Sequence, residues 1–173
     1  SVFIYNRFRI TQKQKLIIEQ KEKETHHQKD VIEEKQKEII DSITYAKRLQ
    51  QAILAPKEEI DKYIPENFLF YKPKDIVAGD FYFFERTNDY IFYAAADCTG
   101  HGVPGAMVSI VCSNALTRSV KEFELTDPGK ILDKTRELIV ETFLKSKQDV
   151  KDGMDISFIS INRKTKEIKW AGA

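Results

Sequence analysis

Hydrophobic and polar positions follow two different patterns along the chain, and the pattern changes near residue 56. From Thr11 to Ala55 there is no glycine or proline, and lysine, glutamate and glutamine dominate. This composition predicts one long helix that ends at Pro56. From residue 57 onward, short apolar runs alternate with turn residues and with helical periodicity. The sequence therefore predicts three segments: residues 1–10, a helical linker over 11–56, and a domain of class α+β over 57–173.

Within the long helix, apolar or small residues recur at a spacing of seven. The spacing strengthens toward the domain, whereas companion positions farther upstream, such as Gln28 and Lys35, are polar. A weak heptad pattern of this kind predicts a coiled coil that forms a parallel homodimer. The positions expected to form the dimer contact are Ile32, Ile39, Ile43, Ala46, Leu49 and Ile53. The alternative is a single solvated helix, or a helix packed against its own domain.

The domain pattern predicts two hairpins and two helices. An aromatic run after Gly79 and an apolar run over 90–97 are separated by a turn near residues 87–89, and the runs 156–162 and 167–171 flank a second turn. Apolar residues at helical spacing predict a helix over 103–123. Asp127 and Pro128 are a typical helix start, and the pattern continues to about Lys147.

The first hairpin brings two acidic residues together. In an antiparallel hairpin the start of one strand lies beside the end of the next, so Asp80 and Asp97 are expected at the same edge. Two carboxylates without a histidine or cysteine cluster suit Mg²⁺ or Mn²⁺ better than Zn²⁺. Gly100, Gly102 and Gly105 allow the main chain to approach an ion or a phosphate. Taken alone, this segment is equally typical of an ordinary turn from strand to helix.

The motif GDFY followed by DCTGHGVPGA resembles the SpoIIE-type branch of the metal-dependent protein phosphatases, the bacterial relatives of protein phosphatase 2C. The resemblance covers the chain from about Asn67 to its end, and the preceding helix is similar to the linkers of such domains. It implies a partial α-β-β-α sandwich after the long helix, and a site for two Mn²⁺ or Mg²⁺ ions that hydrolyses phosphoserine or phosphothreonine. By the same resemblance Asp80, Asp97 and the backbone carbonyl of Cys98 are metal ligands, and His101 lies beside the site.

Three further side chains have candidate roles in that chemistry. His101 can act as a general acid toward the leaving serine oxygen, or it can simply bind a neighbouring loop. Lys72 and Lys74 can attract the substrate phosphate as point charges, although a solvated strand end explains both better.

The resemblance is incomplete at the end of the chain. Members of this family carry further metal-binding aspartates after the strand pair that the last residues resemble, and the chain stops at Ala173. We therefore expect a piece of a longer protein that binds metal weakly and hydrolyses little by itself. Asp155 is a candidate substitute ligand, although a role at the start of a strand fits it better.

Composition narrows the remaining possibilities. The net charge of +1, without a basic stripe, gives no indication of nucleic-acid binding. The two cysteines lack metal-binding spacing and are expected to be reduced thiols of a cytosolic protein. Cys112 and Arg118 have the Cys-x5-Arg spacing of cysteine-dependent phosphatases. However, no glycine intervenes, and Cys112 falls on the apolar side of a predicted helix.

The first ten residues, apolar and aromatic with Arg7 and Arg9, resemble the cytoplasmic end of a membrane span. They predict a parent protein anchored at the inner face of the bacterial membrane. The family suggests a phosphorylated regulatory protein as partner, such as an anti-sigma-factor antagonist. The alternative is a non-catalytic coiled-coil signalling module whose phosphatase-like domain only binds a phosphoprotein.

Overall fold

The structure is a computed structural model that describes residues 2–144 and 152–173. Residues 1–42 and residues 43–173 form two separate compact units. The described residues of the first unit, 2–42, are helical, and the second contains a four-stranded sheet with its covering helices.

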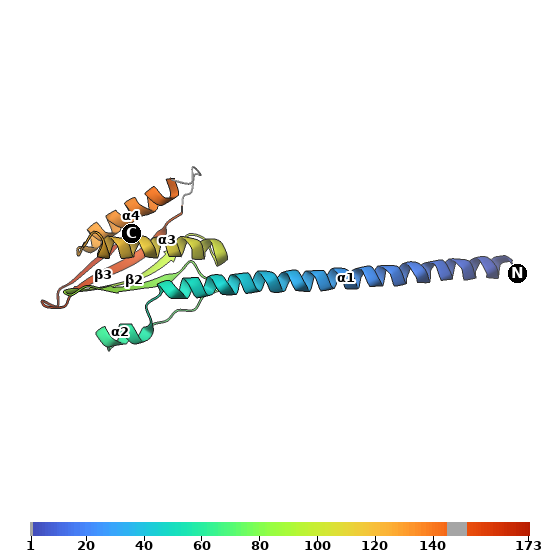
Figure 1. The fold of residues 1–173 in the computed structure, drawn as a ribbon, viewed down its shortest axis with the longest axis horizontal. Coiled ribbons are helices and arrows are strands. Elements are labelled where there is room, and N and C mark those ends of the chain that lie inside the picture. The colour runs from blue at the N-terminus through green and yellow to red at the C-terminus, as the bar shows by residue number, and fades with distance from the viewer. Residues whose placement is uncertain (1, 145–151) are drawn as a thin grey trace. The chain divides into compact units, whose positions relative to one another are not determined.

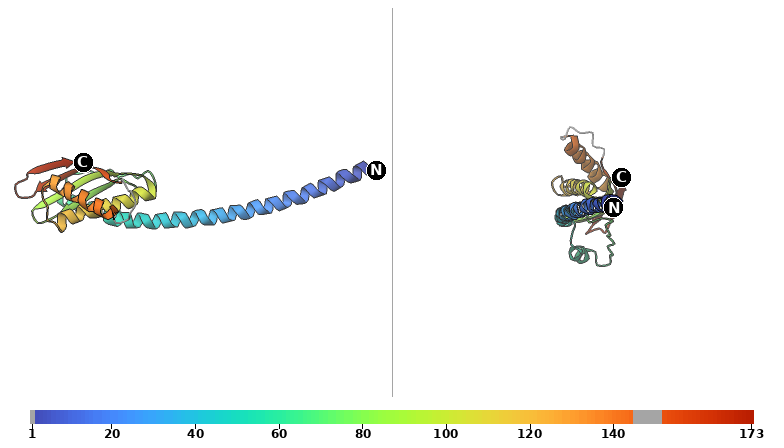
Figure 2. Two further views of the ribbon diagram at one scale, coloured as in Figure 1. Left: turned by 90° about the horizontal axis from the view of Figure 1, so that it is seen from above. Right: turned by 90° about the vertical axis from the view of Figure 1, so that its right-hand side faces the viewer.

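Helix α1 (Val2–Ile53) is continuous, as the linker pattern predicts, and it begins nine residues before the predicted start at Thr11 (Figure 2). Ion pairs between side chains one turn apart, such as Lys29 with Glu33 at 3.6 Å, stabilise the exposed helix. Ile32 and Ile39 remain 57% and 58% exposed in the single chain. Across the described residues, none of the helices is long and apolar enough to cross a bilayer.

The sheet consists of β1 (Phe81–Arg86), β2 (Tyr90–Cys98), β3 (Met154–Asn162) and β4 (Ile168–Gly172). The strands are adjacent in chain order, and every neighbouring pair is antiparallel. Both predicted hairpins are therefore confirmed. The described residues form one sheet with helices, which corresponds to part of the sandwich that the family resemblance implies.

Helices α3 (Gly102–Lys121) and α4 (Pro128–Leu144) cover one face of this sheet (Figure 1). The main core between these layers contains Phe81, Phe83, Phe92, Phe158, Leu116, Val120 and Ile131. Cys112 lies in this core with no exposed surface, as the helical periodicity predicts. Asp127 caps α4 by accepting a hydrogen bond from the Lys130 amide at 3.2 Å. The predicted end of this helix, at Lys147, lies outside the described residues.

The opposite face of the sheet is partly covered by the short helix α2 (Lys57–Tyr63). Ile60 of α2 is buried against Phe84 and Ile91, which alternate with the residues that face the main core. This second, smaller core places α2 beside the end of the sheet where the β1–β2 turn lies.

The last turns of α1 belong to the domain rather than to the free linker. The compact unit begins at Ile43, whereas the composition change placed the boundary at residue 56. Gln50 is only 3% exposed, and Leu54 packs against the main core. Ile43 and Ala46, expected in the dimer contact, are half-buried within this unit. A polar helix can bury a side chain such as Gln50 through hydrogen bonds, and composition alone does not mark such a position.

Candidate metal centre

Three acidic residues lie in one row at one end of the sheet. Phe81 of β1 is paired with Ala96 of β2, which sets Asp80 beside Asp97. Asp97 is in turn paired directly with Asp155 of β3. The hairpin geometry thus brings Asp80 and Asp97 to the same edge, as predicted. The register also adds Asp155, because residues directly opposite each other on paired strands have their side chains on the same face of the sheet.

The carboxylates of Asp80 and Asp97 repel one another. Partial burial, the hydrogen bond with Asp97 and the charge of Asp97 together raise the pKa of Asp80 above its ordinary value. Among the described residues, no lysine, arginine or histidine forms an ion pair with Asp80, Asp97 or Asp155. Negative charge is therefore concentrated at this edge, and none of the described basic residues pairs with it.

The glycines bring two backbone segments into direct contact behind these carboxylates. A Cβ on Gly79 would lie 2.7 Å from the carbonyl oxygen of Gly100 and 2.9 Å from that of Cys98. A Cβ on Gly105 would lie 2.5 Å from the same Gly100 oxygen. Gly100 also has a φ of +84°, which side chains disfavour. The loop after β2 is thus packed against the segment that carries Asp80, and the Cys98 carbonyl faces that segment.

These donors fit part of a hard divalent cation site. Two adjacent carboxylates, with a main-chain carbonyl oxygen close by, are the oxygen ligands that Mg²⁺ and Mn²⁺ prefer. The uncompensated charge of the two carboxylates also favours a cation at this edge. Within residues 2–144 and 152–173, however, no group of three or more histidine, cysteine or acidic side chains is arranged to hold a metal ion. The described residues thus supply part of a ligand set.

His101 lies at the start of α3 beside an acid that the sequence reasoning missed. Its backbone occupies the N-cap position, and its Nδ1 lies 3.3 Å from Oδ2 of Asp75. The imidazole is 81% exposed and therefore accessible to a substrate. Asp75 lies in an irregular segment far upstream, where no periodicity or motif marks it.

The two candidate phosphate-binding lysines lie in different pockets. Lys72 lines a pocket of about 500 Å³ together with Asp80 and several aromatic residues. Lys74 lines another of about 520 Å³ together with Asp75 and Gly102. Both lysines are exposed, and only Lys72 shares a pocket with a predicted metal ligand.

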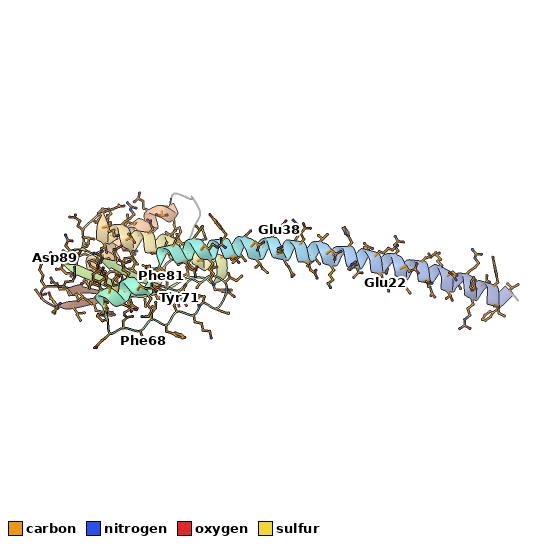
Figure 3. All side chains as sticks on the ribbon, turned by 60° about the horizontal axis from the view of Figure 1, so that its bottom comes forward. Glu22, Glu38, Phe68, Tyr71, Phe81 and Asp89 are labelled. Atoms are coloured by element: carbon orange, nitrogen blue, oxygen red, sulfur yellow. The ribbon has the colours of Figure 1, made fainter. Side chains whose placement is uncertain are left out.

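Aromatic side chains form most of the wall of the pocket beside Asp80. The Tyr71 hydroxyl donates to the Asp80 carbonyl at 3.2 Å, and the Tyr71 ring meets Tyr82 edge to face at 5.7 Å. Burial and the charge of Asp80 raise the pKa of Tyr71, so its hydroxyl stays protonated. Phe68 and Phe70 are 87% and 80% exposed, and Figure 3 shows Phe68 on the outer side of this segment.

Gln50 connects the end of α1 to the segment that carries Asp80. Its side-chain amide donates to the Ala78 carbonyl and to Ser109 Oγ at 2.9 Å, and its Oε1 accepts from the Ala78 amide at 3.2 Å. One buried side chain thus fixes the backbone two residues before Asp80. The sequence reasoning missed Gln50 because it is one of many glutamines in the polar helix.

Cys98 and Cys112 interact inside the core. The hydrogen bond with Cys112 and burial raise the pKa of the Cys98 thiol, which is therefore neutral. Because Cys112 has no exposed surface, its Sγ is inaccessible to a substrate, which agrees with a structural role.

The domain is similar to a solved structure named "SiaA-PP2C domain of Pseudomonas aeruginosa". The two share 32% sequence identity with a TM-score of 0.69, over 80% of this chain and 55% of that chain. The chain thus spans little more than half of that domain. A second structure comes from work on the bacterial stressosome as a modular system adapted to control secondary messenger signalling. It has 17% sequence identity and a TM-score of 0.43, over 57% of this chain and 45% of that one. This likeness is too weak to indicate a shared fold. No family model and no curated protein matches the sequence.

Proposed function

We propose, since the chain belongs by its fold to the PP2C-like phosphatases, that its parent protein is a metal-dependent protein serine/threonine phosphatase of the SpoIIE type. Its substrate is a phosphoserine or phosphothreonine on a regulatory protein of bacterial signal transduction, such as an anti-sigma-factor antagonist. The observation that carries this proposal is the uncompensated pair Asp80 and Asp97, held against a glycine-lined loop.

In this proposal Asp80, Asp97 and the Cys98 carbonyl hold Mn²⁺ or Mg²⁺. Bound ions of this kind supply an activated water and neutralise phosphoryl oxygens. Asp75 orients the imidazole ring of His101, and His101 acts as the general acid that gives a proton to the leaving serine oxygen. Lys72, which shares a pocket with Asp80, attracts the substrate phosphate as a point charge. Lys74 is a weaker candidate, because its pocket excludes both predicted metal-binding carboxylates.

The chain by itself is expected to turn over little substrate. The described residues provide two close carboxylates but no larger ligand group, so the proposal takes the remaining ligands from outside the described residues. The same observation favours a second candidate, a phosphoprotein-binding signalling module without catalysis. These candidates differ in whether the full-length protein hydrolyses a phosphopeptide.

In this proposal, helix α1 regulates the activity of the phosphatase site. Ile32 and Ile39 expose apolar surface at heptad spacing, which supports a parallel homodimer. Gln50 offers a direct connection from that helix to the Asp80 segment. The exposed apolar residues Val2, Phe3 and Ile4, with Arg7 and Arg9 nearby, support a membrane anchor in the parent protein.

The test compares Asp97→Asn with wild type in the full-length protein, using a phosphoserine peptide and Mn²⁺. Because the variant loses a metal-binding carboxylate, the proposal expects kcat/KM to fall by at least about 100-fold. Asp133→Asn, which removes an exposed carboxylate on α4, is the matched control and should retain activity. Unchanged hydrolysis by Asp97→Asn would overturn the assignment, and an inactive wild type would favour the binding module.

A further inference from the structure

The end of the sheet opposite the acidic row contains a large pocket. It has a volume of about 850 Å³ and lies between the end of α2, the β1–β2 turn and the β3–β4 turn. We propose that this pocket, the basic pocket, binds an acidic peptide segment with interspersed apolar residues, contributed by a protein partner. The proposal concerns a surface separate from Asp80 and Asp97, and it does not depend on phosphatase activity.

Cations surround one aromatic ring at this pocket. The guanidinium carbons of Arg86 and Arg163 lie 4.8 and 5.6 Å from the ring centroid of Tyr63, and Lys62 Nζ lies 5.7 Å from it. A guanidinium held near a ring keeps its N–H groups available for a carboxylate. Tyr63 therefore gathers positive charge on a surface of a chain whose net charge is only +1.

Only part of this positive charge is neutralised within the chain. Arg86 pairs with Glu59 at 3.7 Å, and Lys164 pairs with Asp89 at 2.6 Å. In the described part of the chain, Lys62, Arg163 and Lys166 have no carboxylate within ion-pair distance, and Glu66 is the only acidic residue that lines the pocket. The surface thus retains an excess of positive charge.

The two turns that carry these cations are held together by hydrogen bonds. The Arg163 amide donates to the Asp89 carbonyl at 2.7 Å, and its guanidinium donates to the Asn88 carbonyl at 2.9 Å. The Asn162 side chain accepts from the amides of Lys164 and Thr165 at 2.9 and 3.0 Å. Figure 3 marks Asp89 at this end of the domain. Cations on a rigid framework lose less entropy when a ligand binds.

The lining of the pocket identifies the class of ligand. Ile64 and Ile161, both half-buried, provide apolar surface between the cations, and the pocket is far larger than one phosphate group requires. Nucleic acid would require an extended basic stripe, and this patch is confined to one end of the sheet. Alternating carboxylate and apolar side chains match both the charge and the surface of this pocket.

The test measures fluorescence anisotropy of a labelled peptide, rich in aspartate and glutamate with interspersed leucines, on the full chain. The double variant Lys62→Glu with Lys166→Glu reverses two unpaired cations, and we expect it to weaken binding by at least about tenfold. Lys37→Glu with Lys130→Glu changes the net charge equally at exposed positions far from the pocket in sequence, and it should bind like wild type. Circular dichroism checks that all variants remain folded.

Three results would overturn the proposal: no binding of the acidic peptide by wild type, equal loss in both double variants, or equal binding of the same peptide with asparagine and glutamine in place of its acids. Competition by single-stranded RNA but not by unlabelled acidic peptide would also overturn it, because the ligand class would then be wrong. Binding that weakens with added salt and requires the peptide carboxylates supports it.

Discussion

The two ends of the sheet carry opposite charge, and each end accommodates its charge in a different way. At one end, Asp80 and Asp97 adjoin each other, and closely packed backbone lies behind them. At the other end, three cations lie around Tyr63, and of these Arg86 is paired with Glu59 of the same chain. Charge that remains unbalanced on a rigid framework indicates a ligand from outside the chain.

The largest expected effect comes from the glycine packing, which only the acidic end requires. Gly105→Ala places a Cβ against the Gly100 carbonyl, so we expect the free energy of unfolding to fall by about 2 to 3 kcal/mol. Gly153→Ala is the control, since a Cβ there meets no described atom within 4 Å.

Urea unfolding measures both changes. Mn²⁺ titration of Gly105→Ala should show weaker binding, whereas acidic-peptide binding at the basic pocket should be retained. Equal stability of the two alanine variants would show that the close backbone contact is unimportant.

A somewhat smaller effect is expected from the buried amide that connects α1 to the acidic end. Gln50→Leu leaves the Ala78 amide and carbonyl without their partner, and the cost of unpaired buried groups is about 2 kcal/mol. Gln51→Leu, on the exposed side of the same helix, should be nearly neutral.

Amide hydrogen exchange distinguishes a local effect from a general one. The segment around Ala78 should exchange faster in Gln50→Leu, while the β3–β4 turn keeps its protection. Faster exchange throughout the domain would contradict a specific connection between Gln50 and the Asp80 segment.

The smallest expected effect tests the charges themselves. Asp80→Asn removes like-charge repulsion at the sheet edge and should stabilise the metal-free chain by up to about 1 kcal/mol, while it weakens Mn²⁺ binding. Asp89→Asn breaks the exposed pair with Lys164 and should destabilise by only about 0.5 kcal/mol. A gain of stability at one end and a loss at the other is the expected contrast.

The pH dependence has a defined sign. Because the pKa of Asp80 is raised, the folded metal-free chain binds more protons than the unfolded chain between the ordinary and raised values, so this group lowers stability as pH rises through that range. Excess Mn²⁺ should reverse the trend, since it binds the charged carboxylates. Unfolding with a chelator and with Mn²⁺, for wild type and Asp80→Asn, measures the difference. An identical pH profile in the chelator would contradict the raised pKa.

Local sequence patterns predicted much of the fold because they reflect local physics. The absence of glycine and proline predicted α1, and alternating apolar residues predicted both hairpins. Met107 shows where periodicity fails: it lies at helical spacing with the core residues of α3 but is 59% exposed. Periodicity identifies an apolar helix without defining which part of its surface the sheet covers.

In the candidate site, too, contacts within one hairpin were predictable and contacts between distant segments were not. Asp80 and Asp97 were predictable, because one hairpin fixes their proximity. Asp75 beside His101 was not, since no short-range rule relates residues in an irregular segment to a helix start distant in sequence.

By itself, the sequence determined the helices, the hairpins and the acidic edge, all of which depend on interactions between residues close along the chain. Only the tertiary structure decided that Gln50 belongs to the domain, that Asp155 joins the row of Asp97, and that the basic pocket forms around Tyr63. Each of these depends on contacts between segments separated by many residues, and a local pattern carries no information on how such segments pack.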